Sequence, residues 1–318
     1  MNGITRRTAL LGAAALTAPA VAQTRPVRIV VAFPPAGAAD IVARLLADRL
    51  RAAWDTPVVV ENRAGAGGNI AGAEVARAEP DGHTLLITSQ SIAVNRLLYA
   101  RMPFDPMADL APVAMVIQVP NVMVVPAGAP DRSVADVLAR ARAAPGRLNY
   151  GSAGVGTSIH LAGELFAHLA SVRMTHVPYR GAGPAMQDLI GGRLDVMFDT
   201  LTVSAGPIRQ GGIRALGVTT PARAPTLPEV PPIADTVPGY ALSSWFAFFA
   251  PARTPAATVA RQARDIGAAL REPAVAARLA ELGATPVGST SEALSVAMRD
   301  EARLWEPIIR AANIRIEE

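Results

Sequence analysis

The 318-residue chain contains no cysteine and no lysine, and only 4% of its residues are aromatic. Without cysteine it can form no disulfide and carry no lipid on a thiol, so its stability has to come from a packed core. Without lysine it cannot build a phosphate-binding P-loop, which needs a lysine to reach the nucleotide phosphates. These absences leave a protein that binds or acts through its backbone, hydroxyl groups, carboxylates and arginines.

The N-terminus reads as an export signal. Met1–Arg7 is short and basic, Thr8–Ala18 is apolar, and Ala20–Ala22 has the small-x-small spacing of a signal-peptidase site. This pattern predicts a signal peptide over residues 1–22. The paired arginines within Thr5–Leu10 also fit a twin-arginine signal, so both export routes stay open. No later stretch reaches the roughly 20 apolar residues of a membrane span.

The charge is small and dispersed. All thirty cations are arginine, the formal charge is +4, and removing Arg6 and Arg7 with the leader leaves +2. Nucleic acid is therefore not expected as a partner, because its phosphates call for a concentrated basic face.

Apolar runs of strand length alternate with helical patterns along the chain. This alternation predicts an α/β fold of mainly parallel sheets flanked by helices, and the length favours two lobes. Two extended, proline-bounded stretches, residues 119–130 and 243–255, suit crossings between the lobes. We expect lobe 1 to be discontinuous (23–125 and 244–318), with lobe 2 formed by 126–243. The stretch from Pro255 to Ile309 reads as amphipathic helices broken at Pro273 and Gly283.

Two glycine-rich turns, one in each half, each connect an apolar strand to a helix. They span Phe33–Asp40 and Tyr150–Ser158. Small residues let an oxygen approach the backbone, and the partial positive charge of a helix N-terminus favours an anion. Neither turn carries a cation, so we expect a weakly charged anion such as a carboxylate. One such turn alone would read as a tight connection; two in matched contexts favour a site between lobes.

Enzyme signatures are incomplete. The sequence around Ser152 misses the G-x-S-x-G nucleophile elbow because Tyr150 stands where glycine is required. Neither Gly154-Val155-Gly156 nor Gly65-Ala66-Gly67 is followed by the third glycine of a dinucleotide fingerprint. His160 favours a neutral structural imidazole over a general base, and the four histidines lack metal-ligand spacing. We therefore expect no enzyme activity, no cofactor and no metal.

Six short motifs occur in order across the mature chain. The chain resembles the substrate-binding receptors of tripartite tricarboxylate transporters, also called Bordetella uptake gene (Bug) receptors. Ala36 and Arg253 depart from the family, which usually has glycine at both positions. The motifs are Phe33–Asp40 with Ala43-Arg44, Glu61–Asn69, Pro80–Leu85, Tyr150–Thr157 with His160-Leu161, His176–Gly181, and Ala250–Pro255.

The resemblance implies a periplasmic, monomeric receptor with a two-lobed periplasmic-binding-protein fold of type II, the Venus-flytrap type. Such a receptor closes on a small organic carboxylate and delivers it to the membrane components of a tripartite tricarboxylate transporter. An exported orphan carboxylate sensor, or a secreted α/β enzyme, remains the alternative. Family members hold the ligand through main-chain amides, small hydroxyls and bridging water, which leaves the identity of the acid open.

Carried over residue by residue, the resemblance implies ligand contacts from both lobes. Asp199 has two readings, since a buried carboxylate either accepts from a ligand amine or pairs with a local N–H or arginine. Asp40 reads as a first-turn helix residue, and Arg180 as a lobe-surface or hinge residue. The implied contacts are Phe33, Gly37, Ala38, Ala66 and Ser89 from lobe 1, and Ser152, Gly156, Thr157, Ser158, Tyr179 and Asp199 from lobe 2.

Overall fold

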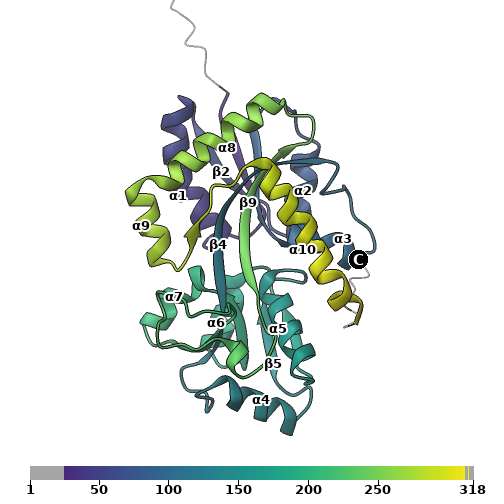
Figure 1. Ribbon diagram of the computed structural model, residues 1–318, viewed down its shortest axis with the longest axis vertical. Helices are drawn as coiled ribbons and strands as arrows, with labels where there is room; N and C mark the ends of the chain where they lie inside the picture. The colour runs from purple at the N-terminus through teal and green to yellow at the C-terminus, as the bar shows by residue number, and fades with distance from the viewer. Residues whose placement is uncertain (1–24, 312–313, 315–318) are drawn as a thin grey trace, which may run out of the picture.

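A computed structural model describes residues 25–311 and 314, so the predicted signal peptide lies outside the described residues. The chain forms two lobes, one above the other in Figure 1, joined by two long strands through the centre of the molecule. These are β4 (Leu110–Pro126) and β9 (Ser243–Pro251). The predicted two-lobed α/β fold is confirmed.

The upper lobe in Figure 1 combines the N-terminal part of the chain with its C-terminal part. Its other elements are β1 (Val27–Val31), α1 (Ala38–Trp54), β2 (Val58–Asn62), η1 (Ala66–Gly68), α2 (Asn69–Ala76), β3 (Thr84–Ser89), α3 (Ser91–Leu98), α8 (Ala256–Arg271), α9 (Pro273–Glu281), β10 (Thr285–Pro286) and α10 (Ser291–Ala311). The lower lobe comes from the middle of the chain. It contains α4 (Val134–Ala143), β5 (Asn149–Ser152), α5 (Ser158–Leu169), β6 (Thr175–Pro178), α6 (Ala182–Ile190), β7 (Val196–Thr200), α7 (Leu201–Arg209), β8 (Ile213–Val218) and η2 (Ile233–Asp235).

The sheet runs β2-β1-β3-β9-β4-β7-β5-β6 across both lobes, with β8 and β10 paired to β4. Strand β1 is parallel to β2 and β3, and β5 is parallel to β6 and β7. The crossing strands are antiparallel to their neighbours, so the sheet is mixed rather than purely parallel. An antiparallel neighbour is the natural result when the chain leaves a lobe on one strand and returns on another.

Strand β4 changes partners where the lobes meet. Residues 110–120 pair with β9, whereas residues 121–126 pair with β7 and β8. At the change, the Asn121 side chain donates to the carbonyl oxygen of Phe198 on β7 (2.7 Å) and accepts from the Ser244 hydroxyl on β9. This buried amide therefore ties three strands together at the crossing. The lobe boundaries at 125/126 and 243/244 stay a prediction.

The C-terminal helices fall where the sequence predicts: α9 begins at Pro273 and ends before Gly283. Helix α10 packs against α3 and β4 (Figure 1). Its Glu301 accepts bonds from the indole N–H of Trp245 (3.0 Å) and of Trp305 (2.7 Å). Burial raises the pKa of Glu301, and the two indole bonds only partly offset that effect. The terminal helix is thus fastened to a crossing strand.

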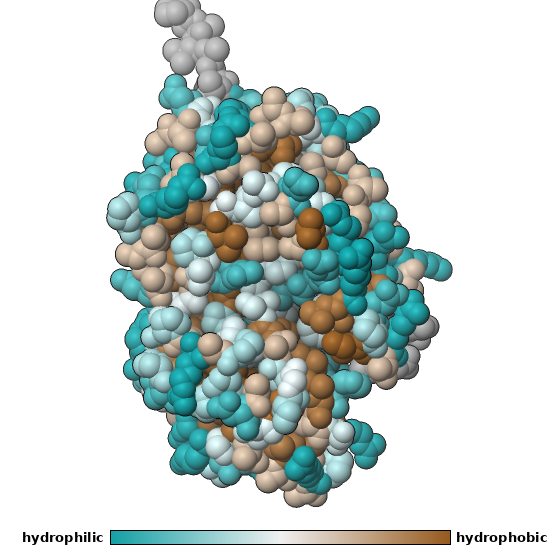
Figure 2. Space-filling model, in the orientation of Figure 1, coloured by the Kyte–Doolittle hydropathy of each residue, from teal (hydrophilic) through white to brown (hydrophobic). Residues whose placement is uncertain are grey.

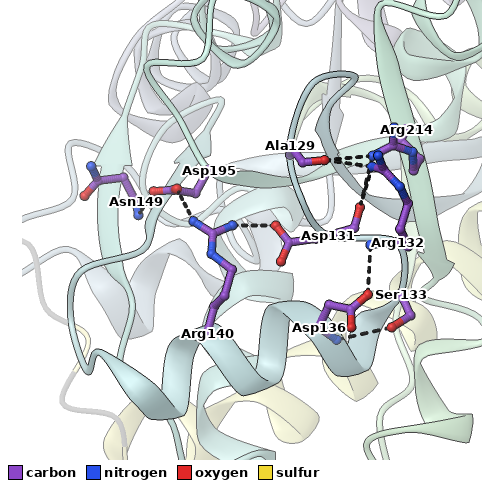
Figure 3. Close-up of polar contacts among 9 residues, drawn as sticks. All are labelled: Ala129, Asp131, Arg132, Ser133, Asp136, Arg140, Asn149, Asp195 and Arg214. Atoms are coloured by element: carbon purple, nitrogen blue, oxygen red, sulfur yellow. Dashed lines mark hydrogen bonds and ion pairs between the residues drawn. The ribbon is translucent and has the colours of Figure 1, made fainter.

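A polar network surrounds α4, which lies at the bottom of the lower lobe in Figure 1; its contacts are drawn in Figure 3. Arg140 on α4 bridges the carboxylates of Asp131 and Asp195, with 2.7 Å to the latter. Arg214 donates to the carbonyl oxygens of Ala129 (3.2 Å) and Asp131 (3.0 Å). These arginines are therefore engaged within the lobe, far from the other lobe.

The surface matches the dispersed charge of the sequence. On the face shown in Figure 2, hydrophilic residues cover both lobes and apolar residues form separate groups among them. Within the described ranges, no helix combines the length and apolar character that crossing a bilayer requires.

Candidate functional site

The loop between β1 and α1 is held by a buried carboxylate. Asp40 is 3% exposed and accepts from the Ala36 N–H (2.9 Å), the Asn62 amide (2.9 Å) and Arg44 Nε (3.0 Å). Asn62 also donates to the carbonyl oxygen of Phe33 (2.9 Å). Burial alone would raise the pKa of Asp40, but the three donors outweigh it and lower the pKa. Asp40 therefore shapes this loop and keeps its charge within the lobe.

Ala36, where the family usually has glycine, sits in that loop with a φ of 64°. This is the left-handed region, which costs an L-residue with a Cβ about 1–2 kcal/mol. Ala36 thus adopts the backbone conformation that glycine would adopt. The substitution of alanine for the family's glycine strains the loop but does not change its conformation.

The loop between β5 and α5 is tied to its own helix. Thr157 caps α5: its hydroxyl donates to the carbonyl oxygen of Gly154 (2.7 Å) and accepts from the His160 N–H (3.4 Å). The Gly156 N–H donates to His160 Nδ1 (3.2 Å). That amide is therefore already satisfied inside the lobe.

Behind this loop lies a stack of rings. The rings of His160 and His176 have centroids 4.1 Å apart, and His176 lies 4.9 Å from Tyr150. Burial, and then the neighbouring His176, lower the pKa of His160, while burial lowers the pKa of His176 to about 4. Both imidazoles are therefore neutral at pH 7. His160 has the structural role that its sequence position favours, since its Nδ1 accepts the Gly156 amide.

Ser152 pairs with one of these histidines, its hydroxyl 2.6 Å from His176 Nε2. This spacing is that of a nucleophile and a base. Ser152, however, is fully buried, and its hydroxyl is also in contact with the backbone of Gly154. These contacts engage the hydroxyl within the lobe, so the pair stabilises the loop.

A cavity of about 40 Å³ lies between the lobes. Both lobes contribute to its wall, through residues of the two glycine-rich loops, of β3 and β9, and of the turn before α6. Its lining residues are Phe33, Pro34, Pro35, Gly37, Ala38, Ala39, Ser89, Ala153, Thr157, Ser158, Ile159, Ala182, Gly183, Thr200 and Phe246.

The predicted ligand contacts separate into three groups. Six of them line this cavity together: Phe33, Gly37, Ala38, Ser89, Thr157 and Ser158. Ala66 and Tyr179 line an adjoining hollow of about 290 Å³ between the lobes, which also includes Phe33. Ser152, Gly156 and Asp199 line neither space.

Asp199 is fully buried at the end of β7, next to the cavity-lining Thr200. Its Oδ2 accepts from the Ser204 hydroxyl (2.7 Å), and its Oδ1 has no partner among the described residues. Burial raises the pKa of Asp199 to about 7, although the hydrogen bonds from Ser204 and from the Thr200 N–H lower it in part. Of the two sequence readings, the geometry favours the local partner.

Sequence reasoning missed several lining residues, including Ala182 and Gly183. They follow Gly181, which ends the His176–Gly181 motif, so the start of the next helix was the available signal. Phe246 comes from the crossing strand β9, and Thr200 directly follows Asp199. For Phe246, no local pattern marks the residue, because its place depends on the pairing of β9 with β3 and β4.

The electrostatics of the cavity come from the backbone. Helices α1, α5 and α6 begin at Ala38, Ser158 and Ala182, which all line it, and α7 follows the lining residue Thr200. First-turn amides of a helix have no partner within the helix and carry partial positive charge. None of the described lining residues is charged. The cavity therefore suits a carboxylate held by amides and hydroxyls.

The lobes touch through glycines. A Cβ added at Gly181 of the lower lobe would lie 2.6 Å from Cγ of Pro34 in the upper lobe. A Cβ added at Gly156 would lie 2.8 Å from Cδ1 of Leu98 on α3. Real Cβ atoms do not approach so closely, so the Gly156 and Gly181 backbones can lie against these side chains of the other lobe only because glycine has no side chain.

A two-lobed α/β fold with a cavity between the lobes, lined by helix N-termini, defines a solute-binding receptor. Within this class, residues 42–314 match the family described as "Tripartite tricarboxylate transporter family receptor". The chain belongs to this family.

Two curated relatives illustrate the similarity. The chain is 42% identical over 288 residues to the "UPF0065 protein in tcbD-tcbE intergenic region" of Pseudomonas sp. (strain P51), covering 90% of this chain and 86% of the relative. It is 35% identical to "Protein BugT" of Bordetella pertussis, covering 99% of each chain. The suspected Bug resemblance is confirmed.

Solved structures agree with the fold. The structure "R. palustris Rpa4515 with adipate" has a TM-score of 0.89 and 38% identity, covering 92% of this chain and 99% of its own. The structure "MatC (Rpa3494) from Rhodopseudomonas palustris with bound malate" has a TM-score of 0.85 and 30% identity, covering 90% and 99%.

Replacing Ala36 with glycine is expected to stabilise the protein. Glycine removes the cost of the left-handed backbone but loses more entropy on folding, so we expect a gain of about 0.5–1 kcal/mol in the free energy of unfolding. Urea denaturation would measure it. The control is Ala39→Gly within helix α1, which should lower the same free energy. An equal loss of unfolding free energy in both variants would contradict the inference that the backbone at Ala36 is strained.

Gly156→Ala is expected to keep the lobes apart, because its Cβ would meet Leu98 and Asn95 of α3. Small-angle scattering should show a larger radius of gyration in the presence of ligand than for the unmodified protein. The matched control is Gly146→Ala, since Gly146 has a similar φ (77° against 80°) but nothing within 4 Å of an added Cβ. If both variants expanded equally, the cause would be backbone strain at positive φ and not a clash between the lobes.

Asp199→Asn is expected to change how stability depends on pH. Because the folded pKa of about 7 lies above the unfolded value of 3.8, neutral Asp199 favours folding below about pH 4, and this advantage is lost as the pH rises to 7. Between about pH 4 and 7, the free energy of unfolding of the variant should therefore rise relative to that of the unmodified protein, by at most about 1.4 kcal/mol per pH unit. Melting temperatures from pH 4 to 8 would test this. A constant difference would show that Asp199 keeps an ordinary pKa.

Proposed function

We propose that this protein binds a small organic carboxylate between its lobes and delivers it to the membrane components of a tripartite tricarboxylate transporter. The observation that carries the proposal is the cavity, in which the starts of helices α1, α5 and α6 face one space without a charged side chain. The adipate and malate in the two similar structures support a carboxylate as the ligand class.

Closure would follow from this arrangement. A carboxylate that accepts bonds from both lobes makes more contacts in the closed state than in the open one, so it stabilises closure by that difference. The crossing strands β4 and β9, with Asn121 between them, are the place where the lobes can bend relative to one another.

We further propose that the protein catalyses no reaction, works as a monomer and reaches the periplasm by its predicted signal peptide, through either export route. Three features support the absence of catalysis: Ser152 is buried, the pKa values of His160 and His176 are lowered by burial so that both imidazoles are weak bases, and the cavity lining offers no charged group. The described residues also contain no cluster of three or more histidine, aspartate or glutamate side chains placed to hold a metal.

Thr157→Ala is expected to weaken carboxylate binding by about 0.5–3 kcal/mol, because Thr157 lines the cavity and its hydroxyl holds the start of α5 in place there. Titration calorimetry with adipate and malate would measure the loss, and the neutral diamide of adipate should not bind. Thr175→Ala is the control, since that hydroxyl donates to Gly146 on the lobe exterior. Tight binding of the diamide, or no binding of any acid, would refute the proposed function.

A further inference from the structure

The cavity is partly open, and its free volume of about 40 Å³ is small for a ligand pocket. The adjoining hollow of about 290 Å³ adds further space, and the two spaces share Phe33, Pro34 and Ala153 in their walls. A ligand with one carboxylate among the helix N-termini can therefore extend past these residues into the hollow.

The hollow contains one charged residue among its described lining, Arg180. Arg180 lies in the turn between β6 and α6, directly before Gly181, whose missing side chain lets this turn meet Pro34 of the other lobe. The remaining wall comes from both lobes, with residues 64–68 on one side and residues 153–155 on the other. Arg180 thus lines the space between the lobes, whereas its sequence position suggested a lobe surface or hinge.

Arg180 is exposed and makes no hydrogen bond or ion pair with any described residue. The nearest acid along the chain, Asp188 on α6, is already engaged. It accepts from the Tyr179 hydroxyl (2.7 Å) and from Arg193 (2.7 Å). By contrast, Arg140 elsewhere in the same lobe bridges two carboxylates (Figure 3). No described carboxylate therefore pairs with Arg180, which lies next to a cavity suited to a carboxylate ligand.

We propose that Arg180 binds a second anionic group at the far end of the ligand, so that the receptor selects dicarboxylates over monocarboxylates. The inference rests on the proposed function and adds the class of ligand. The first carboxylate lies against helix N-termini in the cavity, and the second reaches the guanidinium in the hollow. Because the guanidinium is exposed, water and salt weaken the pair, and we expect it to contribute about a five- to tenfold gain in affinity.

The experiment compares diacids with monoacids of the same chain length: succinate with butyrate, and adipate with hexanoate. Titration calorimetry on the unmodified protein, Arg180→Gln and Arg173→Gln gives the affinities. Arg173 is the matched control, an exposed arginine of the same lobe near the opposite end of β6, without a described side-chain partner. We expect Arg180→Gln to lose about five- to tenfold for the diacids and less than twofold for the monoacids, with Arg173→Gln unchanged.

Three results would overturn the inference while leaving the receptor function intact. They are equal affinity of the unmodified protein for diacid and monoacid, an equal loss for both in Arg180→Gln, and no loss for either. Binding of no acid at all would overturn the proposed function as well. Raising the salt concentration should reduce the diacid preference of the unmodified protein and leave Arg180→Gln unaffected.

Discussion

The starts of three helices, α1, α5 and α6, line one space, and this gathering of helix N-termini is the constraint on which the proposed site depends. The amides of a helix N-terminus can stabilise an anion only at hydrogen-bond distance, so the surrounding wall has to be small enough to let the ligand reach the backbone. This accounts for Gly37, Ala38, Ala39, Ala182 and Gly183 in the lining. It also makes a charged side chain unnecessary there, since the partial charges of the helix N-termini replace it.

The same requirement governs how the lobes meet. Amides from both lobes can share one carboxylate only if the lobes come close, and Gly156 and Gly181 leave room for the side chains of α3 and of Pro34. Different residues of the second glycine-rich loop therefore have different roles. Thr157 and Ser158 line the cavity. The Gly156 N–H donates to His160, and the absence of a Gly156 side chain leaves room for α3 of the other lobe. Loop geometry, lobe contact and ligand space are set by neighbouring residues of one turn.

Much of this could be read from the sequence, because strand runs and turn chemistry are local. The strands at Val27 and Ile213, the helix break at Pro273 and the glycine-rich turns between strand and helix all follow from short patterns. What could not be read is how separate segments combine. The antiparallel crossing strands, and the place of Phe246 in the cavity, depend on pairings across the whole chain. Likewise, nothing in the sequence shows that the Gly156 amide is already bonded to His160.

The position of β9 has a consequence for how the chain folds. In the sheet, β9 lies between β3 and β4, although it begins only at Ser243. Until that strand has been synthesised, β3 presents an unpaired edge, and α10 cannot fasten Trp245 through Glu301. The strands of the lower lobe, in contrast, follow one another along the chain. The core cluster of the lower lobe nevertheless includes Trp305 and Ile309 of α10, so the packing of both lobes has to wait for the C-terminal part of the chain.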